Sequence, residues 1–130
     1  MTGKKPIIVV TIVSALALLA GCGKKANPID MPSNDAVTSI EVVTLGGAKV
    51  DITEAGQIEI VMDALSAAEP TRTQSVNDQP TNVVAYGTVS INTAGEATVV
   101  YYYEKDGKYY IEQPYIGIYK LEESLEDLLL

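Results

Sequence analysis

The sequence predicts a small α+β domain, in which an antiparallel sheet is covered by one main helix and a short C-terminal helix. Residues 39–52 alternate apolar and polar side chains in two runs around Gly46 and Gly47, which indicates a first hairpin. Residues 58–65 carry apolar side chains at helical spacing. Residues 83–112 contain three further alternating runs joined by short turns, which indicates a three-stranded meander.

The loop of the first hairpin decides which apolar side chains share a face of the sheet. A two-residue loop would place the apolar side chains of the two strands on opposite faces, whereas the three-residue loop 46–48 places them on one face. We expect the longer loop, which commonly needs a glycine in the left-handed region. The inward side chains are then Ile40, Val42, Val50 and Ile52.

The two helices are predicted from their apolar stripes. The main helix should begin after Thr53, whose hydroxyl can cap the first turn, and end near Ala68, before Pro70. Its stripe comprises Ile58, Val61, Met62 and Leu65. The loop 69–82 that follows is longer than most connections in a compact domain. After a short extended segment at 116–120, the final helix has a stripe of Leu121, Leu125, Leu128 and Leu129.

Two short turns set the register of the meander. Its strands are expected at 83–92, 97–104 and 108–112. The turns are Ala94-Gly95 and Asp106-Gly107, and Asp-Gly between apolar runs is a strong hairpin signal. Tyr102 then lies opposite Gly87 and Ile111, on the face that should meet the helix. A large ring beside a strand glycine covers the gap that the missing side chain leaves.

The other face of the meander carries tyrosines that could bind a ligand. The same register places Tyr103 between Tyr86 and Tyr110, with Tyr101 on the same face. Aromatic rings give a large contact area at low entropic cost. The candidate binding face therefore comprises Tyr86, Tyr101, Tyr103 and Tyr110. Two other interpretations stay open: the C-terminal helix covers these rings, or tyrosine merely suits exposed strands.

The first 21 residues have the pattern of a cleavable export signal. A basic start with Lys4 and Lys5 precedes the apolar run 6–21, which is shorter than the roughly 20 residues that a spanning helix needs. The run ends in Leu19-Ala20-Gly21-Cys22, which resembles the lipobox of bacterial lipoproteins. The resemblance implies cleavage before Cys22 and a diacylglyceryl group on its sulfur, and two acyl chains give stable anchoring.

The anchor places the rest of the chain on the extracytoplasmic side of the cell membrane. The alternative, an uncleaved anchor helix with an incidental cysteine, places it there too. Residues 22–36 contain two prolines and several turn formers but no apolar period, so they are expected to be a flexible linker. The folded domain is expected at residues 37–130.

The charge of the chain excludes several partners. The formal net charge is −8, and removing residues 1–21 takes away two lysines, leaving seven basic and seventeen acidic side chains, a charge of −10. Nucleic acid is therefore not an expected partner, because phosphate contacts need clustered basic residues. Attraction to an anionic membrane surface is also disfavoured, with Lys24 and Lys25 as the exception beside the lipid.

The residue types also limit the chemistry. The chain has no histidine and one cysteine, which excludes internal disulfides, histidine-assisted nucleophiles and zinc sites with histidine or cysteine ligands. Acidic side chains that could bind calcium or exchange protons are Asp78, Glu104, Asp106 and Glu112. They lack the short, regular spacing of a calcium loop, so we expect them to be solvated and expect neither a metal nor a cofactor.

Two motifs carry a resemblance to a known family. They are residues 75–80, Ser-Val-Asn-Asp-Gln-Pro, and residues 109–115, Tyr-Tyr-Ile-Glu-Gln-Pro-Tyr. Together they resemble uncharacterised lipoproteins of Gram-positive bacteria, domain of unknown function 5301, over most of residues 38–120. The resemblance implies an extracytoplasmic domain and supplies no activity or site residue.

These observations favour a non-catalytic binding module of the cell envelope, whose partner is a protein, a peptide or a glycan. The alternative is a small carboxylate-dependent enzyme that acts on envelope carbohydrate. Glycoside hydrolysis needs two carboxyl groups at a defined separation across a cleft. A 94-residue domain with one thin sheet has little room for such a cleft, so an enzyme is not expected.

Overall fold

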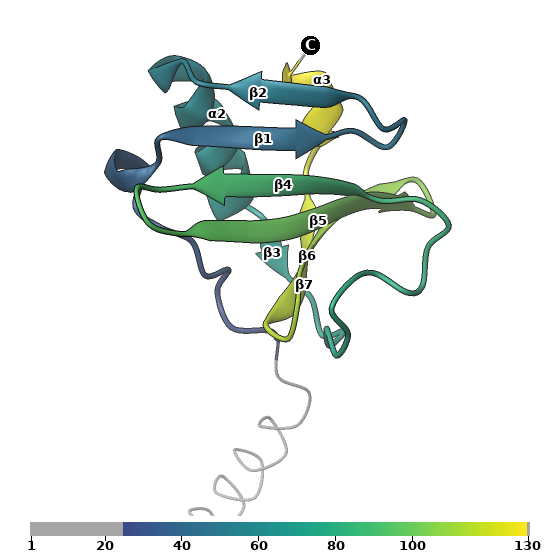
Figure 1. Cartoon of the computed structure of the whole chain (residues 1–130). Helices are drawn as coiled ribbons and strands as arrows, with labels where there is room; N and C mark the ends of the chain where they lie inside the picture. Colours follow the sequence, from purple (N-terminus) through teal and green to yellow (C-terminus); the bar gives the residue numbers. More distant parts are fainter. Residues whose placement is uncertain (1–24, 130) are drawn as a thin grey trace, which may run out of the picture.

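The computed structural model describes residues 25–129, which form one seven-stranded antiparallel sheet with both α-helices against the same face (Figure 1). The elements are η1 (Asn34–Ala36), β1 (Ser39–Val43), β2 (Lys49–Ile52), α2 (Ala55–Ser66), β3 (Glu69–Pro70), β4 (Gly87–Asn92), β5 (Ala97–Lys105), β6 (Lys108–Gln113), β7 (Gly117–Leu121) and α3 (Leu125–Leu129). The strand order is β2-β1-β4-β5-β6-β7-β3, which confirms the α+β class. The predicted export signal and Cys22 lie outside the described residues.

In the first hairpin, the apolar side chains of both strands share one face as predicted, but the loop lies one residue earlier than predicted. Val42 pairs with Val50, and the Thr44 amide donates to the Ala48 carbonyl over 2.8 Å. The loop is therefore 45–47 and not 46–48. Gly47 takes the left-handed conformation at φ 88°, which an L side chain would strain. Moving the loop by one residue shifts the pairing by two, so the same side chains still face inward.

The meander has the predicted register and one more strand than expected. Gly87 pairs with Tyr102, and Tyr102 pairs with Ile111. Asp106 and Gly107 both have positive φ, as the predicted tight turn requires. The expected extended segment at 116–120 is β7, which pairs with β6 and continues the meander.

The predicted first strand of the meander is shorter than expected. β4 begins at Gly87, and residues 83–86 belong to the long loop that precedes it. Ala85, which the predicted strand would place on the inward face with Gly87, is exposed. The other end of this loop holds β3, which pairs with the edge of β7.

The main helix buries the predicted stripe but does not use the predicted cap. α2 begins at Ala55 with Glu54 as its N-cap residue, and no side chain caps it. The Ile58 amide donates to the Glu54 carbonyl in the first helical hydrogen bond, which places Thr53 one residue too early to cap. The buried residues of the helix are Ile58, Val61, Met62 and Leu65.

The C-terminal helix lies beside α2 on the inner face of the sheet. Leu125 is 1% exposed and joins the main core, while Leu128 and Leu129 pack against it. Leu121 belongs to β7 and not to this helix. α3 therefore adds to the main core and does not cover the predicted tyrosine row.

The described part of the predicted linker, residues 25–36, packs on the domain instead of extending as a flexible tether. The Asp30 amide and carbonyl bond the side-chain amide of Gln113 over 2.8 and 2.6 Å. The Ala26 amide donates to the Thr71 carbonyl over 3.0 Å. A Cβ at Gly117 would lie 2.5 Å from the Ala26 methyl, so only glycine permits this close approach.

Candidate functional site

The predicted tyrosine row divides into two pairs on the outer face, which is the sheet face away from the helices. The Tyr103 and Tyr110 rings stack with centroids 5.7 Å apart at an interplanar angle of 29°. The Tyr86 and Tyr101 rings meet edge to face, 5.3 Å apart at 86°. Because β4 begins only at Gly87, Tyr86 packs on Tyr101 and not on Tyr103.

The long loop between β3 and β4, and not the C-terminal helix, covers Tyr103 of the stacked pair, whereas Tyr110 stays partly exposed. Tyr103 is only 2% exposed. The Ser75 hydroxyl donates to Glu112 Oε1 over 2.8 Å, and the Tyr103 hydroxyl donates to Glu112 Oε2 over 3.4 Å. Ser75 and Glu112 are themselves buried. The loop and the sheet therefore enclose a second, smaller buried cluster on the outer face.

The two sequence motifs pack against each other at this cluster. The Tyr115 amide donates to the Ser75 hydroxyl oxygen over 3.3 Å. The Tyr115 hydroxyl donates to Asp78 Oδ1 over 2.7 Å, and Tyr115 has a positive φ of 63°. The motifs therefore hold the loop on the sheet, which is a structural role for Asp78 and Glu112.

Burial also affects the acidity of the phenols. Desolvation and then the Glu112 carboxylate raise the pKa of Tyr103, and desolvation and then the hydrogen bond to Glu126 raise the pKa of Tyr102. The Tyr102 hydroxyl reaches Glu126 Oε1 over 2.9 Å. Both phenols therefore stay protonated near neutral pH and act as hydrogen-bond donors.

The four candidate carboxylates lie at different places on the described domain. Within residues 25–129, no group of three or more histidine, cysteine or acidic side chains is arranged to hold a metal ion. Glu104 and Asp106 are exposed near the β5–β6 turn, whereas Glu112 is buried under the loop. The structure therefore does not bring the four candidate carboxylates together.

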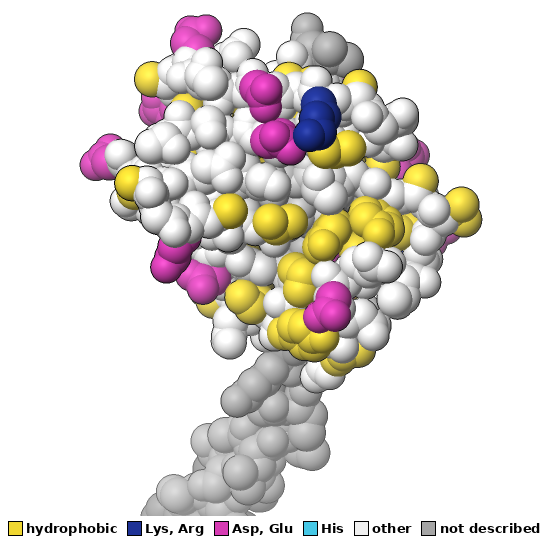
Figure 2. All heavy atoms as spheres, in the orientation of Figure 1, with side chains coloured by type: hydrophobic (Ala, Val, Ile, Leu, Met, Phe, Trp, Pro, Cys, Tyr) yellow, Lys and Arg dark blue, Asp and Glu magenta, His cyan; other side chains and the backbone are white. Residues whose placement is uncertain are grey.

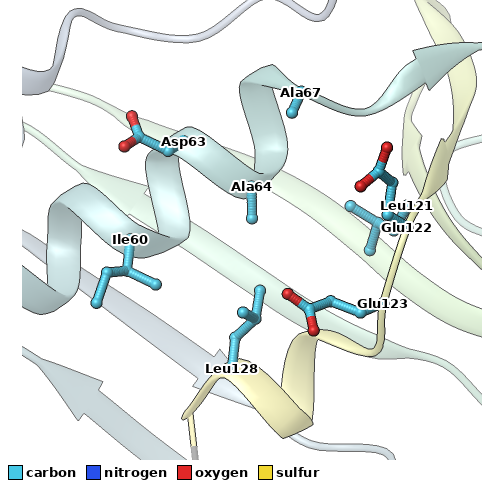
Figure 3. Close-up of a pocket in the computed structure, with 8 residues that line it drawn as sticks. All are labelled: Ile60, Asp63, Ala64, Ala67, Leu121, Glu122, Glu123 and Leu128. Atoms are coloured by element: carbon cyan, nitrogen blue, oxygen red, sulfur yellow. The ribbon is translucent and has the colours of Figure 1, made fainter.

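A groove runs between α2 and α3 on the helical side (Figure 3). It has a volume of about 380 Å³. Its apolar lining comprises Ile60, Ala64, Ala67, Leu121 and Leu128. Its acidic lining comprises Asp63, Glu122 and Glu123.

A second cavity lies where the described chain begins. It has a volume of about 430 Å³ and is lined by residues 25–27, by 71–76 and by Tyr115 and Ile116. Arg72 and Lys25 are exposed here, and so is the ring of Tyr115. The N-terminal segment and the loop that covers Tyr103 therefore both line this cavity.

The sheet, with helices on its inner face and a loop over part of its outer face, defines a small α+β domain. Comparisons with known proteins give its family. A family model described as "Domain of unknown function (DUF5300)", named DUF5301, matches residues 25–120. The chain therefore belongs to this family. The NMR structure of a protein from Ruminococcus gnavus superimposes with a TM-score of 0.69 and 32% sequence identity, covering 78% of this chain and 99% of that chain. None of the curated proteins matches this chain.

Proposed function

We propose that this chain is a lipid-anchored module on the extracytoplasmic side of the cell membrane, which binds a protein, peptide or glycan without catalysing a reaction. The observation that carries the proposal is the sequence Leu19-Ala20-Gly21-Cys22 at the end of an apolar run. A cysteine-linked diacyl group would supply the membrane attachment. Among the described residues, no helix is long and apolar enough to supply it.

The open part of the outer face is the proposed binding surface. Tyr86 and Tyr101 meet edge to face there, and Val99 beside them is 39% exposed. Hydroxyl side chains from β4, those of Thr88 and Ser90, lie on the same face. Figure 2 shows hydrophobic side chains gathered from the middle of this face toward its lower part. Aromatic anchors among small polar side chains are typical of binding surfaces.

The anchor is tested with Cys22→Ala in the full chain. We expect the variant to lose all lipid labelling and to remain an uncleaved precursor, because the acceptor sulfur is absent. The measurement is metabolic labelling with a fatty acid, together with detergent phase partitioning. Thr11→Ala, which leaves the lipobox unchanged, should behave like the parent. A Cys22→Ala chain that is processed and labelled like the parent would overturn the anchor.

The binding surface is tested with Tyr101→Ala in a pull-down from envelope extract. We expect this variant to lose the captured component, because truncation removes the ring that Tyr86 packs against. Glu59→Ala on the exposed side of α2 is the control and should capture as the parent does. Equal capture by Tyr101→Ala and the parent would show that the binding surface lies elsewhere.

A further inference from the structure

The docked N-terminal segment sets how far the domain can stand from its anchor. The structure places Ala26 on Thr71 and Gly117, so the fixed part of the chain begins near Lys25. Only Gly23 and Lys24 separate Lys25 from Cys22. Three extended residues reach roughly 11 Å at most. If Cys22 carries lipid, this end of the domain is therefore held at the bilayer surface.

The surface at this end is built from three connected segments. The Ala26 amide bonds to Thr71, and the Thr71 amide and hydroxyl bond to the Ile118 carbonyl over 2.9 and 2.8 Å. The Tyr115 amide bonds to the Ser75 hydroxyl. Figure 1 shows the start of the described chain beside the β6–β7 turn at one end of the sheet, with β2 and α3 at the opposite end.

The side chains of this end suit an anionic lipid surface. Lys25 and Arg72 are exposed at the rim of the second cavity. Val76 and Tyr115 are also lining residues, and they are 63% and 65% exposed. Basic side chains are attracted to anionic headgroups, and tyrosine rings prefer the depth of the headgroups. The Asp78 carboxylate is hydrogen-bonded to this group, through the Tyr115 hydroxyl.

We propose that the basal surface, formed by Lys25, Arg72, Val76 and Tyr115, rests on an anionic membrane leaflet and fixes the orientation of the domain. This proposal rests on the lipid anchor proposed above and adds a direct lipid contact to it. The contact turns β2, α3 and the groove beside α2 away from the membrane. Although the chain is acidic overall, its membrane contact is local and basic.

The test uses single thiol labels on the lipidated full chain in vesicles of phosphatidylcholine with phosphatidylglycerol. Cys22 is the only cysteine and its sulfur is blocked by lipid, so each introduced cysteine is the sole labelling site. Gln74→Cys places a fluorophore at the basal surface, and Glu123→Cys is the matched control beside the distant groove. A quencher attached to lipid headgroups should quench the label at residue 74 severalfold more than the label at residue 123. Equal quenching at the two positions would overturn the proposal.

Vesicle flotation and a charge variant separate the two proposals. Flotation in the same samples reports anchoring, so a chain that does not float refutes the lipid anchor, whereas a floating chain with equal quenching refutes only the basal contact. Lys25→Glu with Arg72→Glu should float like the parent and show a smaller quenching difference, as should the parent in pure phosphatidylcholine vesicles, because only the short connection to Cys22 then keeps residue 74 nearer the bilayer than residue 123. Folding of the double variant is checked by its urea melt. A folded double variant that keeps the full difference would exclude the basic contact.

Discussion

Replacing Tyr103 with alanine is expected to lower the free energy of unfolding by about 3–5 kcal/mol, as much as replacing Tyr102. The two rings lie on opposite faces of β5, but they are 2% and 4% exposed. Tyr102 packs in the main core under the helices, and Tyr103 packs under the loop between β3 and β4. Truncating either ring therefore leaves a cavity. Urea melts of the two variants measure the loss.

The third tyrosine of the strand provides the control. Tyr101 directly precedes them in sequence, lies on the open part of the outer face, and is only half-buried. Tyr101→Ala should cost about 1 kcal/mol, the scale of a lost cross-strand pair. A Tyr103→Ala loss as small as that of Tyr101→Ala would show that the loop does not cover the ring in solution.

A hydroxyl-only change separates packing from hydrogen bonding at this cluster. Tyr103→Phe keeps the ring and removes the donor to Glu112 Oε2, while Ser75 still donates to Oε1. The expected loss is about 1 kcal/mol, since one long hydrogen bond disappears and one carboxylate oxygen loses a partner. Most of the Tyr103→Ala effect is therefore expected from the ring.

The sequence predicts the faces of the sheet well because strand pairing has a strict period of two. Once the turn at Asp106 and Gly107 is recognised, the pairing of Tyr102 with Ile111 and of Tyr103 with Tyr110 follows. The first hairpin shows why the inward-facing side chains can be predicted correctly even when the loop is misplaced by one residue. Moving the loop by one residue shifts the pairing by two, and the inward side chains stay inward.

That the loop between β3 and β4 covers Tyr103 on the outer face could not be predicted in the same way. The loop between β3 and β4, residues 71–86, has no period, and its contacts depend on Ser75, a small polar side chain of the kind that forms turns. Its partner Glu112 is expected from the sequence to be a solvated strand residue, but in the structure it is buried. The one available signal was that two separate motifs, 75–80 and 109–115, carry the family resemblance. Their packing against each other gives that resemblance a physical reason.

The prediction of a flexible linker at residues 25–36 is wrong for a related reason. Prolines and turn formers indicate a tether when they occur without an apolar period. In the structure, the segment is held by the paired hydrogen bonds of Asp30 with Gln113, by the close approach of Ala26 to Gly117, and by Ile29 and Met31, which pack against the core. None of these contacts leaves a periodic pattern. The consequence for function is large, because a docked segment shortens the connection between the domain and Cys22.

Replacing Gly87 with alanine is expected to lower the free energy of unfolding by about 2–3 kcal/mol, because Tyr102 and Val43 on the two adjacent strands already occupy the space that a side chain needs. A Cβ there would lie 2.2 Å from Tyr102 Cε1 and 2.6 Å from the Val43 carbonyl oxygen. The ring would have to leave its place in the core, and the backbone oxygen belongs to the adjacent strand β1. The loss is measured by urea melts at constant temperature.

Gly95 supplies the matched control for this substitution. It lies in the turn between β4 and β5, and a Cβ there would meet nothing within 4 Å. Gly95→Ala should therefore change the free energy of unfolding by about 0.5 kcal/mol or less. Similar small effects at both glycines would mean that Tyr102 does not cover Gly87, and the register that places both residues in the core would then be wrong.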